Sequence, residues 1–181
     1  MLSTLLLVAG LARSTELSVS PSTLLESARS LGEPASGSAN SRGGRSDLPA
    51  PIMADGSGLP AGQGKAADGE DLYVERCADC HGLEGQGGSA MELVGDPATL
   101  ATEFPDRGIA AFWPYAPPLF DYVRRAMPPE APWSLSADDT YAVVAWLLQL
   151  NGLIEPDQRV DADLLSTLPM PNRDGFHTVL D

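Results

Sequence analysis

The strongest constraint on this chain is a Cys-x-x-Cys-His run formed by Cys77, Cys80 and His81. Thiols at this spacing can add across the two vinyl groups of a haem, and the imidazole that follows can reach the iron. The 2 cysteines of the chain both lie in this run, so none is left to complete a Cys₄ or Cys₂His₂ zinc site. We therefore expect one covalent haem c, attached through Cys77 and Cys80, with His81 as an axial iron ligand.

A Cys-x-x-Cys pair also occurs in redox dithiols, which gives a second interpretation of the same residues. A thioredoxin-like dithiol would place Cys77 and Cys80 in a βαβ pattern, and no such pattern is visible around them. In this interpretation the protein is a haem-free dithiol oxidoreductase, and the mature protein would show no haem absorbance. The histidine directly after Cys80 favours the haem.

Aromatic residues begin only at Tyr73. Large aromatic side chains dominate core burial, so the stretch before Tyr73 is not expected to fold alone. Residues 32–64 are rich in Gly, Pro, Ser and Ala, which is typical of flexible linkers. We expect a signal or leader with a flexible, disordered linker over residues 1–65, and a monohaem domain with a C-terminal tail over residues 66–181.

The N-terminus carries a short apolar run, Leu5 to Ala12. A membrane span takes about 20 apolar residues, so this run is too short to be one. It resembles the apolar region of a secretory signal, although the usual basic residues before it are missing. Because thioether attachment of haem normally takes place outside the bacterial inner membrane, we expect a periplasmic protein without a membrane span.

The formal net charge of −14 comes from the C-terminal part of the chain. Residues 1–65 hold 5 acidic and 5 basic residues, so residues 66–181 carry 20 acidic residues against 6 arginines. Such a surface repels nucleic acid and anionic membranes and favours a partner with a basic docking patch. The alternative is that the acidity only keeps the protein soluble.

Capping residues and apolar spacing predict three helices before the last one. The first covers residues 68–77 with Asp68 as N-cap, and the second covers residues 97–103. The third covers residues 118–127, with Pro118 in its first position. Prolines directly after residue 127 end this third helix.

The last predicted helix covers residues 136–150. Ser136 and Asp139 form a capping-box pair at its start, and an Asn-Gly pair ends it. Its sequence is apolar almost all round, so we expect burial on more than one side. Gly69 on the first helix would allow a close crossing opposite Trp146 or Tyr141. Residues 155–181 are expected to form an irregular tail, and the whole domain is expected to be all-α.

The second axial ligand of the iron is expected to be Met127. It lies 46 residues after His81, enough chain to reach the other face of a haem, and the prolines after it would hold the thioether rigidly. Met170, which lies between two prolines, is the rival, and His177 would serve in a bis-His site. Met91 lies too close to the glycine-rich loop that follows His81.

Four further side chains are candidates for the haem environment. Arg124 and Arg125 could pair with the haem propionates, because a guanidinium matches a carboxylate, or they could form the exposed face of a helix. Trp113 and Tyr115 could line the haem crevice or pack between helices. With His and Met as ligands the iron has no open position, so we expect outer-sphere electron transfer and no substrate site in this chain.

The sequence resembles class I c-type cytochromes. It is more similar still to the cytochrome subunit of bacterial sulfite dehydrogenase and to the related cytochrome subunit of the sulfane dehydrogenase of thiosulfate-oxidising systems. The resemblance is carried by residues 71–82, 113–127, 136–152 and 170–176. It implies a small helical fold around one covalent haem, with Met127 as the distal ligand.

The resemblance also implies partners. Electrons would come from a molybdenum-containing sulfite-oxidising subunit and pass to a soluble cytochrome c or an oxidase. The sulfane dehydrogenase subunit has two haems, whereas this chain has one Cys-x-x-Cys-His run, which favours the electron-accepting subunit of a periplasmic sulfite dehydrogenase. The alternatives are the cytochrome component of a sulfane dehydrogenase and a free cytochrome c that feeds a terminal oxidase.

Overall fold

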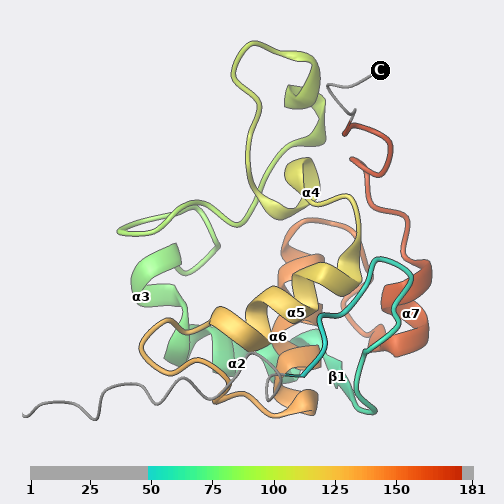
Figure 1. The fold of residues 1–181 in the computed structure, drawn as a ribbon. Helices are drawn as coiled ribbons and strands as arrows, with labels where there is room; N and C mark the ends of the chain where they lie inside the picture. The colour runs from blue at the N-terminus through green and yellow to red at the C-terminus, as the bar shows by residue number, and fades with distance from the viewer. Residues whose placement is uncertain (1–48, 177–181) are drawn as a thin grey trace, which may run out of the picture. The chain divides into compact units, whose positions relative to one another are not determined.

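The structure is a computed structural model that describes residues 49–176 (Figure 1). Residues 1–48 of the expected leader and linker, together with His177, lie outside these residues. The described part is mostly helical, as predicted, and no helix in it is long and apolar enough to cross a membrane. Its elements are, in chain order, β1 (Gln63–Lys65), α2 (Ala66–Arg76), α3 (Ala78–His81), η1 (Pro97–Ala101), α4 (Ile109–Phe112), α5 (Ala116–Ala126), α6 (Ala137–Leu150), β2 (Arg159–Asp161) and α7 (Ala162–Thr167).

Helices α2 and α6 cross at the centre of the fold. Gly69 and Tyr73 of α2 are both buried, and a Cβ at Gly69 would overlap the carbonyl oxygen of Ala142. The close crossing is therefore confirmed, but the partner of Gly69 is the backbone of α6 and not the side chain of Trp146 or Tyr141. Only a residue without a side chain lets two helix backbones approach this closely.

Helix α6 has the capping box that the sequence predicts. The Ser136 hydroxyl accepts from the Asp139 backbone N–H at 3.1 Å, and the Asp139 carboxylate accepts from the Ser136 N–H at 3.2 Å. Eight of its 14 residues are buried, which confirms burial on more than one side. The helix ends at Leu150, and Gly152 follows with a φ of +66°.

Two other helices begin earlier than predicted. Helix α2 begins at Ala66, so Asp68 lies in its first turn and is not the N-cap. Helix α5 begins at Ala116, two positions before Pro118, because prolines are tolerated anywhere in a first turn whose N–H groups have no intrahelical partner. The helix predicted over residues 97–103 is the shorter 3₁₀ helix η1.

The predicted linker and the predicted irregular tail both contain regular structure. Strand β1, at the end of the predicted linker, pairs antiparallel with β2, where Gly64 faces Val160. Helix α7 follows β2, with the Asp161 carboxylate accepting from the Leu164 N–H at 3.0 Å. Upstream of β1, Ile52 is only 7% exposed and belongs to the hydrophobic core. Strands of three residues are too short to show alternation, which explains why the sequence did not reveal them.

Candidate haem site

The Cys-x-x-Cys-His run forms a single helical turn directly after α2. Cys77 is the C-cap of α2, and its N–H donates to the Tyr73 carbonyl at 2.8 Å. The short helix α3 then brings His81 back over Cys77, whose carbonyl accepts from the His81 N–H at 3.0 Å. Cys77 is half-buried, Cys80 is exposed, and both thiols are free of disulfides. The turn therefore presents two thiols and one imidazole from adjacent positions.

The imidazole of His81 is oriented by a backbone carbonyl. Its Nδ1 lies 2.8 Å from the carbonyl oxygen of Met91. A carbonyl can only accept, so Nδ1 carries a hydrogen, and in the neutral ring the lone pair then lies on Nε2. Metal-binding histidines use this arrangement, in which the second ring nitrogen donates to an oxygen and fixes the tautomer. In this orientation Nε2 is the ring nitrogen of His81 that could hold a metal.

The loop after His81 folds back onto α3. The Gly87 N–H donates to the His81 carbonyl at 2.8 Å, and the Ala90 N–H donates to the Cys80 carbonyl at 2.9 Å. Gly82, Gly85 and Gly87 all have positive φ values, which only glycine adopts without strain. Because the loop is this tight, the chain returns to the imidazole of His81 and places the Met91 carbonyl within hydrogen-bond distance of Nδ1.

The redox-dithiol interpretation loses support from the surroundings of Cys77. Burial, with a smaller contribution from the carboxylate of Glu130, raises the pKa of the Cys77 thiol to about 11. Reactive cysteines of dithiol oxidoreductases have lowered pKa values, because the thiolate is the nucleophile. The donor set of two thiols beside an oriented imidazole fits covalent haem attachment better.

Met127 lies at the C-terminal end of α5. Its N–H donates to the Val123 carbonyl at 3.0 Å, and its half-buried side chain packs against the hydrophobic core. The turn that follows lies beside the haem motif, since the charge of Glu130 acts on Cys77. Met170, the rival ligand, is 3% exposed within the core.

The two neighbouring arginines of α5 have different surroundings. Arg125 is paired: its Nε lies 2.8 Å from both carboxylate oxygens of Asp121, and its Nη2 donates to the Ala50 carbonyl at 2.7 Å. The Nε of Arg124 is buried and has no hydrogen-bond partner among residues 49–176. Both guanidinium groups lie over the ring of Trp133, at 5.6 Å for Arg124 and 4.8 Å for Arg125.

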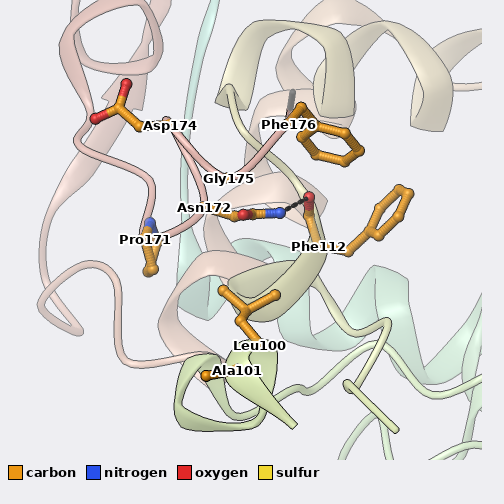
Figure 2. Close-up of a pocket in the computed structure, with 8 residues that line it drawn as sticks. All are labelled: Leu100, Ala101, Phe112, Pro171, Asn172, Asp174, Gly175 and Phe176. Carbon is orange, nitrogen blue, oxygen red and sulfur yellow. Dashed lines mark hydrogen bonds between the residues drawn. The ribbon is translucent and has the colours of Figure 1, made fainter. Parts of the chain in front are cut away.

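The C-terminal tail contacts the segment that holds Trp113 and Tyr115. The Asn172 side chain donates to the Phe112 carbonyl at 2.9 Å (Figure 2). The guanidinium of Arg173 lies 5.2 Å from the centre of the Tyr115 ring. Trp113 packs against the core and against the ring of Tyr122, with 5.8 Å between ring centres.

A cavity of about 450 Å³ lies beside this tail contact, and its lining is mostly apolar. In Figure 2 the rings of Phe112 and Phe176 lie on the same side of the cavity. The two ring centres are 5.5 Å apart in an edge-to-face contact. The residues that line the cavity are Leu100, Ala101, Phe112, Pro171, Asn172, Asp174, Gly175 and Phe176.

Sequence reasoning missed three contributions to the site. Met91 was considered only as a thioether ligand, but its side chain is 54% exposed and its backbone carbonyl holds His81. Trp133 covers both arginines, and its position among prolines was the only sequence signal. Asn172 is 7% exposed, although polar side chains are rarely this buried, and no pattern in the sequence predicted its burial.

Two comparisons with known proteins found matches. Residues 66–151 match the family model of cytochrome c. The chain is also similar in structure to a chain of the sulfane dehydrogenase SoxCD from Paracoccus pantotrophus, with 38% sequence identity and a TM-score of 0.67. The match covers 70% of this chain and 63% of that chain. A search of the curated proteins found no match.

The matched residues run from the first residue of α2 to the residue that caps α6. They include the Cys-x-x-Cys-His turn, the loop that returns to His81 and the end of α5 at Met127. The match of residues 66–151 to the cytochrome c model implies covalent haem c, and Cys77 and Cys80 are the cysteines available for it. Residues 66–151 of this chain therefore have the mostly helical fold of a cytochrome c domain, a kind of domain that transfers electrons.

Proposed function

We propose that this domain carries single electrons on one haem c, which is attached through Cys77 and Cys80 and ligated by His81 and Met127. The observation that carries the proposal is the hydrogen bond from His81 Nδ1 to the Met91 carbonyl at 2.8 Å, within a cytochrome c domain. The haem, when bound, supplies an iron that gains and loses one electron. His81 presents Nε2 in a fixed orientation, and the cysteines hold the ring system next to it.

Met127 is the better of the two candidate sulfur ligands. The side chain of Met170 is almost fully buried in the hydrophobic core, so it already has a packing role. Met127 lies at the end of a helix, half-buried, and is followed by a turn near Cys77. A thioether ligand favours the ferrous state and raises the reduction potential.

Arg124 is a better candidate for a haem propionate than Arg125. Arg125 is occupied by the carboxylate of Asp121 and the carbonyl of Ala50. A buried guanidinium N–H without a partner is costly, so the Nε of Arg124 calls for an acceptor. A propionate is an acceptor that matches it in charge.

We further propose that the protein is the cytochrome component of a sulfane dehydrogenase. The resemblance in sequence favoured sulfite dehydrogenase, but the similar solved structure is a sulfane dehydrogenase, and the identity of 38% supports a shared role. The chain spans 63% of the length of that SoxCD chain. In this role it accepts electrons in the periplasm from a molybdenum-containing catalytic subunit and passes them to a soluble cytochrome c or an oxidase.

Sulfite dehydrogenase remains the second candidate because of one observation. The sequence holds one Cys-x-x-Cys-His run, which suits a monohaem partner of a sulfite-oxidising subunit. The acidic surface of residues 66–181 suits a basic docking patch in either system.

The two candidates can be separated by which catalytic subunit reduces the haem. The full chain is purified from a host that attaches haem to thiols and mixed with each molybdenum subunit and its substrate, a sulfane sulfur compound or sulfite. Rapid reduction by the sulfane subunit alone supports the proposal, and reduction by the sulfite subunit alone selects the second candidate. A colourless protein contradicts the haem assignment. Reduction only by a quinol-oxidising complex contradicts both partners and supports the free carrier.

A further inference from the structure

Asn151 ties together three segments that are far apart in the sequence. Its Oδ1 accepts from the Gly95 N–H at 3.1 Å and from the Ala110 N–H at 3.2 Å. Its Nδ2 donates to the carbonyls of Leu93 at 3.1 Å and Leu147 at 2.8 Å. The amide thus satisfies two donors and two acceptors of the main chain, which is more than the end of a helix requires.

Near Asn151 the backbone segments on either side of Gly108 and Gly95 are closely packed. The Leu93 carbonyl also accepts from the Ile109 N–H at 2.8 Å. A Cβ at Gly108 would overlap the backbone of Val94, so the backbone segments at these two residues are in direct contact. The end of α6, the start of α4 and residues 93–95 therefore meet at one amide group.

Residues 91–95 connect this amide to the haem motif. At one end of the segment the Met91 carbonyl accepts from His81 Nδ1. In its middle the Leu93 N–H donates to the Gly85 carbonyl at 2.7 Å, and at its other end Gly95 is bound to Asn151. The placement of the Met91 carbonyl is therefore determined by α3 and its loop on one side and by Asn151 on the other.

We propose that Asn151 is a positioning residue for the axial histidine: through residues 91–95 it holds the carbonyl that orients the imidazole of His81. The proposal rests on the ligation of haem by His81 stated above. Hydrogen bonding to the second nitrogen of a ligating histidine raises its basicity, which stabilises the ferric state. Loosening the segment should weaken that bond and shift the reduction potential upward.

The test compares two variants of Asn151 with a variant at the other end of the same helix. Asn151→Ala removes all four hydrogen bonds, and Asn151→Asp keeps an acceptor for Gly95 and Ala110 but cannot donate to the Leu93 carbonyl. Ser136→Ala removes the N-cap of α6 and so weakens the helix without touching residues 91–95. All three are made in the full, haem-loaded chain.

Three measurements are made on each variant: the reduction potential, the paramagnetically shifted NMR signals of His81 and the haem methyl groups, and amide hydrogen exchange. In Asn151→Ala we expect a higher potential, moved His81 signals and exchange about five- to thirtyfold faster at Gly95 and Ala110. In Asn151→Asp we expect moved His81 signals with these two amides still protected. In Ser136→Ala we expect a lower melting temperature with the His81 signals and the potential unchanged.

The outcomes separate this inference from the proposed function. If wild-type protein shows haem ligated by His81 but both Asn151 variants resemble Ser136→Ala in potential and His81 signals, Asn151 is only a helix cap and the inference is wrong. If Asn151→Ala does not retain haem, the His81 NMR signals and the reduction potential of Asn151→Asp test the inference in its place. If wild-type protein carries no haem, the proposed function itself fails.

Discussion

The crossing of α2 and α6 and the loop that follows His81 are held together in opposite ways. At the crossing, Gly69 touches the backbone of Ala142 and the surrounding side chains are buried. In the loop, Leu83 is 64% exposed and Met91 is 54% exposed, so burial contributes little. Its shape comes from hydrogen bonds of the backbone to itself, to His81 and to Asn151.

One side chain joins the two regions. Tyr73 is fully buried at the crossing, and its hydroxyl donates to the Gly82 carbonyl at 2.7 Å, at the start of the loop. The scaffold is therefore stabilised by the close packing of buried side chains, whereas the geometry of the site is fixed by directional hydrogen bonds. Changes in volume should unfold the protein, whereas changes in hydrogen bonding should alter the site or cost little.

Adding volume at the crossing should have the largest effect. In Gly69→Leu the new side chain would overlap the backbone of α6, and we expect a loss of more than about 4 kcal/mol in the free energy of unfolding. Urea denaturation of the haem-loaded chain measures it. The control is Ala67→Leu, at an exposed position on the same helix, where we expect a change within about 0.5 kcal/mol. Equal stabilities would show that the crossing does not depend on close approach.

The two methionines should separate scaffold from site. Met170→Ala leaves a cavity in the core and should cost about 2 to 5 kcal/mol, with the weak sulfur-to-iron absorbance band retained. Met127→Ala should abolish that band. Met53, which is 55% exposed, provides the control, and Met53→Ala should change neither property. Loss of the band in Met170→Ala and its retention in Met127→Ala would exchange the two roles.

The scaffold was the more predictable region because its signals are local in sequence. Ser136 and Asp139 lie three residues apart, and their capping box could be inferred from residue type alone. The Cys-x-x-Cys-His turn is equally local. Gly69 suggested a close crossing, but the sequence could not give its partner, because a backbone contact leaves no residue-type signal in α6.

The site was predictable in its chemistry but not in its supports. Asn151 was recognised as the end of a helix, yet its bonds to Leu93 and Gly95 join residues 58 and 56 positions away. The pairing of β1 with β2 likewise joins distant parts of the chain through backbone groups, and the sequence did not predict it. A hydrogen bond to a distant backbone group requires no particular residue type at that position, so only the folded chain reveals it.

Removing the cap of α6 should have a moderate effect on the scaffold alone. Ser136→Ala loses the two hydrogen bonds of the hydroxyl, which accepts from the Asp139 N–H and donates to the Asp139 carboxylate, and should cost about 1 kcal/mol. Thermal unfolding of the haem-loaded chain measures the change. Ser134→Ala, at an exposed position outside the helix, should leave the stability unchanged. A shift in the haem spectrum of Ser136→Ala would contradict the separation of scaffold from site.

The most pH-dependent effect, and at pH 8 one no larger than that of the cap, should come from Tyr141 at the crossing. Burial, assisted by the charge of Asp161, raises the pKa of Tyr141 to about 12, whereas an unfolded tyrosine ionises near 10. The folded state therefore keeps this proton to a higher pH than the unfolded state. The contribution of Tyr141 to the free energy of unfolding is complete below about pH 10 and is lost as the pH rises towards 12. Tyr141→Phe removes the hydrogen bond to the Pro60 carbonyl and should cost about 1 kcal/mol at pH 8.

The alkaline limb of that profile provides the decisive comparison. Urea midpoints between pH 8 and 12 should fall less steeply in Tyr141→Phe than in wild type, so the difference between them shrinks or reverses. Part of the slope should remain, because burial also raises the pKa of Tyr73 to about 12. Tyr122 is 48% exposed, and Tyr122→Phe should follow the wild-type profile. If the urea midpoints of Tyr141→Phe also follow the wild-type profile, burial does not hold Tyr141 in its neutral form. The crossing is then less tightly packed than the expected effect of Gly69→Leu implies.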